Sequence, residues 1–261
     1  MPMDRSGNIS DLNTWLSNRE VSEIKVISPH LDDAAFSLAT FLTEPDLPAR
    51  CVLTVFTRAG PRTPISHAIA SGFATPEEEY SHRRQEDVTA MERLGVVFGH
   101  LGLESGDRGE DKIDQIVDHL NAGAPLDGTL VLLPLGAGGT LSSLTRLLRR
   151  GLRKPMGCPP HGEHLWIRDT LRSKLALSPA GIGYYAEIPY QWANSAKDLS
   201  ARAKALNEGR MACFTWPANA KAKLMAAANY KSQFEGEFGT TPTYQMRTAE
   251  CPEKIFVPAG A

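Results

Sequence analysis

The chain has 261 residues, of which 42% are hydrophobic and 22% are charged, and its formal net charge is −2. This composition is typical of a globular protein, and the near-neutral charge argues against nucleic acid as the main partner, since nucleic acid favours a strongly basic face. No apolar run approaches the ~20 residues that a membrane span needs.

In chain order, apolar runs and helical spacing predict alternating strands and helices. We expect strand 23–29, helix 33–43, strand 51–57, helix 77–94, strand 96–101, helix 111–121, strand 129–134, helix 164–175, strand 182–188 and helices 196–207 and 219–234, with a late strand in the extended stretch 241–258. The alternation predicts an α/β, Rossmann-like fold: a mainly parallel sheet with helices on both faces. The turn after the first strand lacks G-x-G-x-x-G, so we expect no dinucleotide site there.

Features of the whole chain predict one cytoplasmic domain. The first seven residues have no apolar signal core, so we expect a cytoplasmic protein. The sequence shows neither repeats nor a low-complexity linker, which favours a single domain over residues 1–261 with a core at about 23–235. The cysteines are far apart and form no C-x-x-C pair, so we expect reduced thiols; they are Cys51, Cys158, Cys213 and Cys251.

Two stretches are predicted to be long surface loops. The stretch 59–76 is rich in Gly, Pro, Ser and Thr, and the stretch 136–160 contains a basic run at 146–154. Loops of this length in a compact domain are often lids or substrate walls. The basic run fits a solvated helix face equally well.

Three potential metal or proton-handling groups follow the first predicted strand directly. His30, Asp32 and Asp33 stand between the apolar run 24–27 and the predicted helix. The carboxyl edge of a parallel sheet is where α/β folds place their ligands. The alternative is that one aspartate simply caps the helix.

A second cluster, His161 and His164, lies where a loop enters a helix. Two imidazoles three positions apart can face one point, although alone they could also be a surface pair at a helix end. Together with the first cluster, His30, Asp33 and one late histidine would give a divalent metal two nitrogens and one oxygen, the three-ligand set of catalytic zinc sites. Asp32 would then remain free to take a proton from water, and the second histidine to stabilise an oxyanion.

The segment 28–34, Ser-Pro-His-Leu-Asp-Asp-Ala, resembles the P/A-H-P/x-D-D motif of the PIG-L/LmbE-like superfamily of zinc-dependent N-deacetylases. The family's second motif, H-P-D-H after Pro-Leu-Gly-x-Gly-Gly, is similar to 161–164 (His-Gly-Glu-His) after 134–139 (Pro-Leu-Gly-Ala-Gly-Gly). Weaker similarities follow in the family's order at 83–95, 185–190 and 223–233, so the resemblance covers about residues 23–235.

The resemblance implies a role for each residue that matches a family motif. It implies His30, Asp33 and His164 as zinc ligands, Asp32 as general base, His161 as the oxyanion-stabilising or acid histidine, and Arg83, Asp107, Glu187 and Tyr190 on the substrate side. Zn²⁺ is the expected cofactor, and Fe²⁺ also fits a His/His/Asp set.

The chain departs from the family pattern at three places. Leu31 replaces Pro, and Gly162-Glu163 replace Pro-Asp, which makes the second carboxylate one methylene longer. An insertion at 140–160 suggests an altered substrate wall and leaves the roles of His161 and His164 open to exchange. Pro159 stands where some members have a tyrosine.

The expected function is removal of an N-acetyl group from an amino sugar or glycosylated metabolite, and the motif form resembles members from bacterial secondary metabolism. The alternatives are an amidase that cleaves a larger acyl or conjugate amide, and a sugar-binding protein with a degenerate site. The expected partner is a small-molecule sugar or glycoside.

Several residues also have plain structural interpretations. Arg83 could form a solvated salt bridge with Glu79 or Glu86, and Glu187 and Tyr190 could pack at a strand end. Cys158, three residues before His161, could be a soft metal ligand, but the carboxylate-containing set above already suffices. Four other histidines have no partner at metal-ligand spacing, and we interpret each as a surface or satisfied core residue: His67, His82, His100 and His119.

Overall fold

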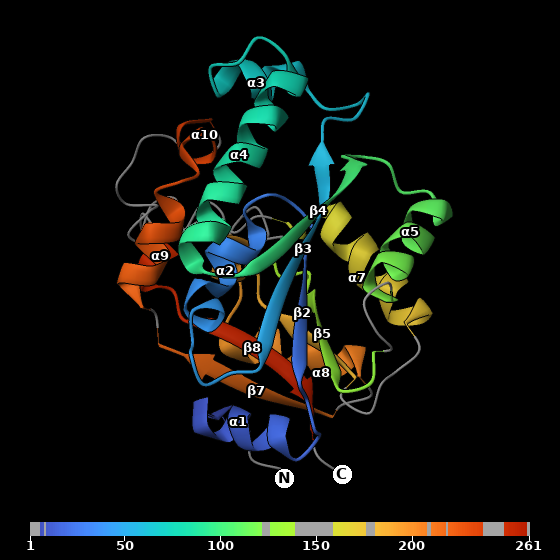
Figure 1. The fold of residues 1–261 in the computed structure, drawn as a ribbon, viewed down its shortest axis with the longest axis vertical. Helices are drawn as coiled ribbons and strands as arrows, with labels where there is room; N and C mark the ends of the chain where they lie inside the picture. The colour runs from blue at the N-terminus through green and yellow to red at the C-terminus, as the bar shows by residue number, and fades with distance from the viewer. Residues whose placement is uncertain are drawn as a thin grey trace, which may run out of the picture.

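The computed structural model describes residues 6–7, 9–121, 126–138, 159–175, 181–207, 210–217, 219–236 and 248–259. Its centre is an eight-stranded sheet in the order β1-β7-β8-β6-β5-β2-β3-β4 (Figure 1). The strands are β1 (Ser6–Gly7), β2 (Glu23–Ser28), β3 (Ala49–Arg58), β4 (Val97–Glu104), β5 (Thr129–Pro134), β6 (Ile182–Tyr185), β7 (Met211–Trp216) and β8 (Glu253–Pro258). The insertion at 140–160 lies outside the described residues apart from its last two positions, and the single-domain expectation stays a prediction.

The pairing of the strands confirms the predicted α/β fold with a mainly parallel sheet. Strands β2 to β6 pair in parallel, whereas β8 runs antiparallel to both β6 and β7. The late strand expected within 241–258 is β8. The sequence pattern did not predict β1 or β7. Strand β7 (Met211–Trp216) is short and lies between two segments with a helical pattern.

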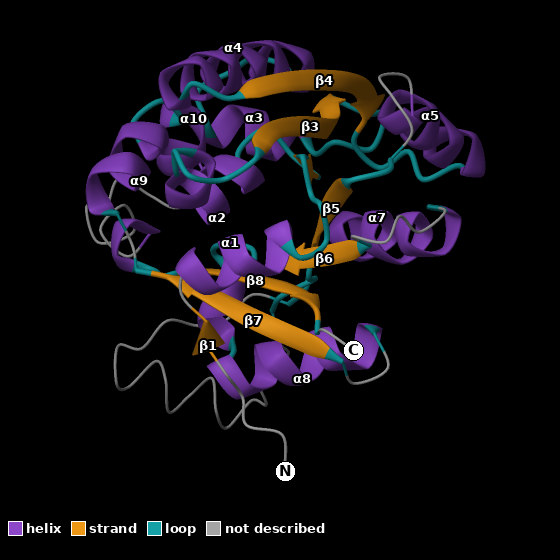
Figure 2. Ribbon diagram, turned by 60° about the horizontal axis from the view of Figure 1, so that its bottom comes forward, coloured by secondary structure: helices purple, strands orange, loops and turns teal. Residues whose placement is uncertain are grey.

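Helices cover both faces of this sheet. They are α1 (Ile9–Ser17), α2 (Asp33–Leu42), α3 (Ile65–Ala70), α4 (Pro76–Leu94), α5 (Glu110–Asn121), α7 (Gly162–Lys174), the 3₁₀ helix η1 (Tyr190–Ala193), α8 (Ala196–Leu206), α9 (Ala220–Ala227) and α10 (Lys231–Gly236). In Figure 1, α2, α4 and α9 lie on one side of β2 and β3, and α5 and α7 lie on the other. Figure 2 shows α8 against the β7 end of the sheet. No helix among the described residues is long and apolar enough to cross a membrane.

Two predicted regions, one loop and one helix, differ from the structure. The loop predicted at 59–76 contains the short helix α3, and the helix predicted at 219–234 is divided into α9 and α10. The division places Tyr230 in the core, where its hydroxyl donates a hydrogen bond of 2.6 Å to the buried carboxylate of Asp87. A side-chain contact to another helix therefore ends α9, and the local apolar pattern gives no sign of it.

Helix α4 buries charged as well as apolar side chains. Met91 and Leu94 are buried, and Gly95 ends the helix in a left-handed conformation with φ of 66°, in agreement with the predicted helix 77–94. The buried face also carries Glu79 and Arg83. Buried charges are costly unless they are paired, so this face indicates a polar partner on the other side of it.

The carboxyl ends of the parallel strands place the predicted site residues at one edge of the sheet. His30 follows the end of β2, Ser105 follows β4, Gly136 follows β5 and Glu187 follows β6. Each of β4, β5 and β6 is a neighbour or next neighbour of β2 in the sheet, so these ends gather around the end of β2.

A buried ion pair, Lys223–Glu253, contacts the backbone of α2 where the helix is interrupted. The helix is broken at Leu38, which has φ of −134° and ψ of 16°. The carboxylate of Glu253 accepts hydrogen bonds of 2.8 Å from the N–H groups of Thr40 and Phe41. The ammonium group of Lys223 lies 3.4 Å from Glu253 and donates to the carbonyl of Phe36. The pair therefore joins α9 and β8 to the helix that begins at Asp33.

We expect Lys223→Met to lower the free energy of unfolding by about 3–5 kcal/mol, because the change leaves the fully buried carboxylate of Glu253 without its cation. Chemical denaturation of the purified protein measures this. The control is Lys221→Met, because Lys221 is exposed on the same helix. Equal stability of the two variants would contradict the role given to the pair.

Candidate metal centre and active site

The turn after β2 is held by short-range hydrogen bonds that fix His30 and Asp33. The hydroxyl of Ser28 donates to the carbonyl of His30 at 2.7 Å and accepts the N–H of Ala34 at 3.1 Å. Asp33 Oδ2 accepts the backbone N–H of His30 at 2.9 Å. Asp32 is the N-cap residue of α2, yet it makes no side-chain hydrogen bond to the helix. Helix capping therefore does not account for Asp32.

Three side-chain atoms from the two sequence clusters converge on one point. His30 Nδ1 lies 3.2 Å from Asp33 Oδ2 and 3.2 Å from His164 Nε2, and His164 Nε2 lies 3.1 Å from Asp33 Oδ2. Ligands of a tetrahedral zinc ion, at bonds of about 2.0–2.1 Å, are separated by roughly 3.3 Å. The two nitrogens and one oxygen therefore fit the ligand set of a divalent ion.

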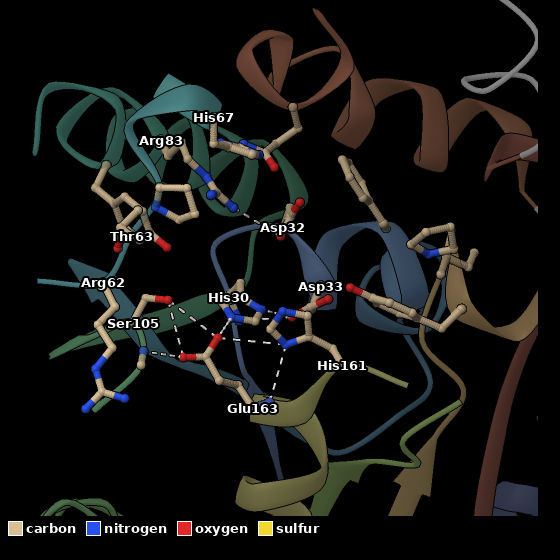
Figure 3. A pocket seen from close by; sticks show the side chains of 18 of the residues that line it. His30, Asp32, Asp33, Arg62, Thr63, His67, Arg83, Ser105, His161 and Glu163 are labelled. Carbon is tan, nitrogen blue, oxygen red and sulfur yellow. Dashed lines mark hydrogen bonds and ion pairs between the residues drawn. The ribbon is translucent and has the colours of Figure 1, made fainter. Parts of the chain in front are cut away.

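The outer nitrogen of each imidazole meets a second buried carboxylate. Glu163 Oε2 lies 2.7 Å from His30 Nε2, and Glu187 Oε1 lies 3.1 Å from His164 Nδ1 (Figure 3 shows the first of these). Glu187 also accepts the N–H groups of Gly136 and Ala137, at 2.8 and 3.0 Å. Carboxylates in this position orient the ring of a metal ligand and fix its tautomer.

Glu163 is itself held from the end of β4. It accepts the N–H of Gly106 at 2.5 Å and the hydroxyl of Ser105 at 3.3 Å. The glutamate stands where the resembled family has an aspartate, and its extra methylene lets it reach both His30 and the β4 loop. The glutamate that departs from the motif thus makes contacts of its own in this chain, to His30 and to Gly106.

His161 offers an alternative ligand. Ring nitrogens of His30, His161 and His164 all lie within 4.8 Å of one another. The His161 side chain is 41% exposed, and its Nδ1 accepts the N–H of Glu163 at 3.4 Å as the cap of α7. His164 is buried, with both ring nitrogens beside carboxylates. The tighter triangle favours Asp33 as the third ligand and leaves His161 facing the cavity.

The buried carboxylates control the charge of the imidazoles. Burial lowers the pKa of His30 and His164, but Asp33 and Glu163 raise that of His30 to about 9, and Asp33 and Glu187 raise that of His164 to about 10. Burial alone would raise the pKa of Asp33, and the two imidazolium groups instead hold it well below its usual range. Burial and the charges on His30 and His164 lower the pKa of His161 to about 4. Without a metal, His30 and His164 are therefore cationic at pH 7.

We expect metal binding to release protons and to strengthen as the pH rises towards 9–10, because both ligand imidazoles must lose a proton whose pKa lies above 7. Titration calorimetry of the metal-free protein in buffers of different ionisation enthalpy counts these protons. The same heat in every buffer at pH 7 would contradict the expectation.

The candidate metal centre lies in a cavity of about 320 Å³. The cavity is lined by His30, Asp32, Asp33, Phe36, Arg62, Thr63, Pro64, His67, Tyr80, Arg83, Ser105, Gly106, Arg108, His161, Glu163, Ile188, Pro189, Tyr190 and Gln233. Asp32 faces Arg83, whose Nη2 lies 3.7 Å from Asp32 Oδ1, on one side of His30 (Figure 3). The size suits a small molecule.

The structure separates the predicted substrate-side residues. Arg83 and Tyr190 line the cavity, whereas Asp107 and Glu187 are not among its lining residues. Asp107 lies 3.5 Å from Lys112, and Glu187 lies behind His164. Substrate contact by these residues stays a prediction.

Sequence reasoning missed several lining residues, because they come from segments without a motif. His67 was expected to be a surface or core histidine, yet it lines the cavity, and its Nδ1 lies 2.7 Å from the buried carboxylate of Glu79. Arg62 comes from the loop before α3, and Tyr80 from α4. For Arg62 and His67, one indication came from the sequence: the prediction that the loop 59–76 is a lid or substrate wall.

No protein-family model and no curated protein matches the sequence. Among solved structures, the chain is similar to the A40926 pseudoaglycone deacetylase, at 20% identity over 92% of this chain and 99% of that one, with a TM-score of 0.60. It is also similar to a zinc-inhibited form of a teicoplanin deacetylase, at 18% identity over 90% of this chain and 97% of that one, with a TM-score of 0.55. A third similar structure is N,N'-diacetylchitobiose deacetylase from Pyrococcus horikoshii, at 13% identity over 96% of this chain and 90% of that one, with a TM-score of 0.55. The chain has the fold of these deacetylases.

We expect Asp33→Ala to abolish stoichiometric metal uptake and His161→Ala to leave it in place, because the triangle of 3.1–3.2 Å includes Asp33. Metal analysis after dialysis against Zn²⁺ measures both variants. The reverse result would make His161 the third ligand.

Proposed function

We propose that the protein is a metal-dependent N-deacetylase that removes an acetyl group from an amino sugar or a glycosylated metabolite. The observation that carries the proposal is the convergence of His30, Asp33 and His164 beside Asp32, whose carboxylate is outside that triangle. The fold shared with three deacetylases supports it.

His30, Asp33 and His164 would hold the metal, with Zn²⁺ the first expectation and Fe²⁺ the second. A divalent ion there supplies Lewis-acid chemistry, which polarises a carbonyl and makes water more acidic. Glu163 and Glu187 would orient the two imidazoles, because each carboxylate holds the outer ring nitrogen.

Asp32 would act as the general base. Its carboxylate lines the cavity directly before the ligand Asp33 and makes no capping bond. It would take a proton from the water that attacks the acetamide carbonyl. Arg83 Nη2 lies 3.7 Å from Asp32 Oδ1, so its positive charge faces this carboxylate.

His161 would carry a proton to the departing amine and stabilise the oxyanion. Its ring lines the cavity, with its centre 4.9 Å from that of His30 and 5.1 Å from that of His164. In the metal-free protein, burial and the charges on His30 and His164 lower the pKa of His161 to about 4. Arg83 and Tyr190 on the cavity wall would contact the sugar, and Asp107 keeps a predicted substrate role.

We expect release of acetate from N-acetyl amino sugars that stops when a chelator is added. Acetate detection across a panel of such sugars and of N-acetylated glycosides tests this. A protein that binds stoichiometric metal and releases no acetate from any of them would contradict the proposal. Glucosamine with longer acyl chains, measured in parallel, separates a deacetylase from an amidase for larger acyl groups.

We expect Asp32→Asn to retain the metal and to lose turnover by about 10²-fold or more, since the amide cannot accept the proton from water. Metal analysis and steady-state kinetics measure the two effects. Asp46→Asn, at an exposed loop position, is the matched control. Full activity of Asp32→Asn would remove the base assignment.

A further inference from the structure

The acidic groups of the cavity are already engaged by other residues. Asp33 lies between His30 and His164, and Glu163 is held by His30 and by the N–H of Gly106. Asp32 faces Arg83. The base of the cavity is therefore close to charge balance before any substrate enters.

Two further arginines line the same cavity, and no carboxylate of the described residues is paired with either of them. Arg62 and Arg108 are exposed, and no ion pair among the described residues involves either of them. By contrast, Arg58 at the end of β3 lies 3.8 Å from Glu104 at the end of β4. Among these loop arginines, the two that line the cavity are thus the ones without an ion pair to a described residue.

Arg108 lies beside Gly162, the residue that follows the proposed catalytic histidine. A Cβ atom at position 162 would lie 3.1 Å from Nη2 and 3.2 Å from Nη1 of Arg108, so Gly162 leaves the space that this guanidinium occupies. Gly162 is the first residue of α7, and His161 is its cap. The guanidinium thus adds its charge to the positive end of the α7 dipole.

Arg62 reaches the rim from the loop between β3 and α3. Figure 3 shows it on the same side as Ser105, with its guanidinium directed away from His30. Ser105 and Gly106 hold Glu163, and Arg108 follows two residues later. Arg62 lies near Ser105 in Figure 3, and Arg108 is two residues from Gly106, so both arginines lie near the loop that follows β4.

We propose that Arg62 and Arg108 bind an anionic group of the substrate, a carboxylate or a phosphate, on the part of the molecule that lies outside the metal centre. Guanidinium groups suit these anions because their planar donors match the paired oxygens, and the attraction also steers the substrate to the cavity. The proposal rests on the proposed deacetylase function and narrows its substrate to negatively charged N-acetyl sugars.

The test compares three probes: N-acetylglucosamine, which is neutral, N-acetylmuramic acid, which carries a carboxylate, and N-acetylglucosamine 1-phosphate. The measured quantity is the ratio of kcat/KM for each anionic probe to that for the neutral one. We expect this ratio to be well above one in the wild type and to fall about tenfold in Arg62→Gln and in Arg108→Gln, because KM for the anionic probe rises. The ratio should also fall as the salt concentration is raised. The stronger of the two anionic probes identifies the preferred group.

Arg58→Gln is the matched control, because Arg58 is an exposed arginine outside the lining residues, and its ratio should equal that of the wild type. Equal ratios in all four proteins, with acetate released, would overturn the anion site and leave the deacetylase function standing. Calorimetric binding of the same probes to Asp32→Asn, alone and combined with Arg62→Gln or Arg108→Gln, does not depend on turnover. The arginine substitutions could abolish the tighter binding of the anionic probes in this assay while the wild type releases no acetate. That result would support the anion site and contradict the deacetylase function.

Discussion

The arrangement of two imidazoles among three buried carboxylates is the constraint on which the rest of the site depends. His30 lies between Asp33 and Glu163, and His164 lies between Asp33 and Glu187. Three carboxylates this close and this buried need positive charge, because buried ions are costly when unpaired. In the metal-free protein the protons on the two imidazoles provide it, and a divalent ion would replace them. The same atoms thus serve as a charge cluster or as a ligand set.

The fold brings these groups together from separate elements of the sheet and its helices. His30 follows β2, Glu187 follows β6, and His164 belongs to α7, which begins at Gly162. Glu187, after β6, joins β5 and α7 as well, because it accepts from Gly136 and Ala137 after β5 while it holds His164. At the break in α2, the Lys223–Glu253 pair supports the helix that begins at Asp33. The site is therefore fixed by buried polar contacts rather than by apolar packing alone.

Charge is distributed unevenly over the cavity, and this links the proposed chemistry to substrate choice. The acidic groups lie at the base, where Asp32 faces Arg83 and the others hold imidazoles. The guanidinium groups of Arg62 and Arg108 lie at the rim on the β4-loop side. A substrate that presents its acetamide to the base and an anion to the rim would match both ends.

Much of the fold and part of the site could be predicted from the sequence, because both depend on short-range patterns. Alternating apolar runs predicted the strands β2 to β6, and the polar cluster at 30–33 after the first of them indicated a ligand site at the sheet edge. The sequence alone determined the fold class and the set of candidate ligands, since periodicity and residue chemistry are local properties. Only the tertiary structure decided which carboxylate meets which ring nitrogen, that His67 and Arg108 reach the cavity, and that Glu253 enters the break in α2. These contacts join residues far apart in the chain, and their distances are set by how the helices and loops pack around the sheet.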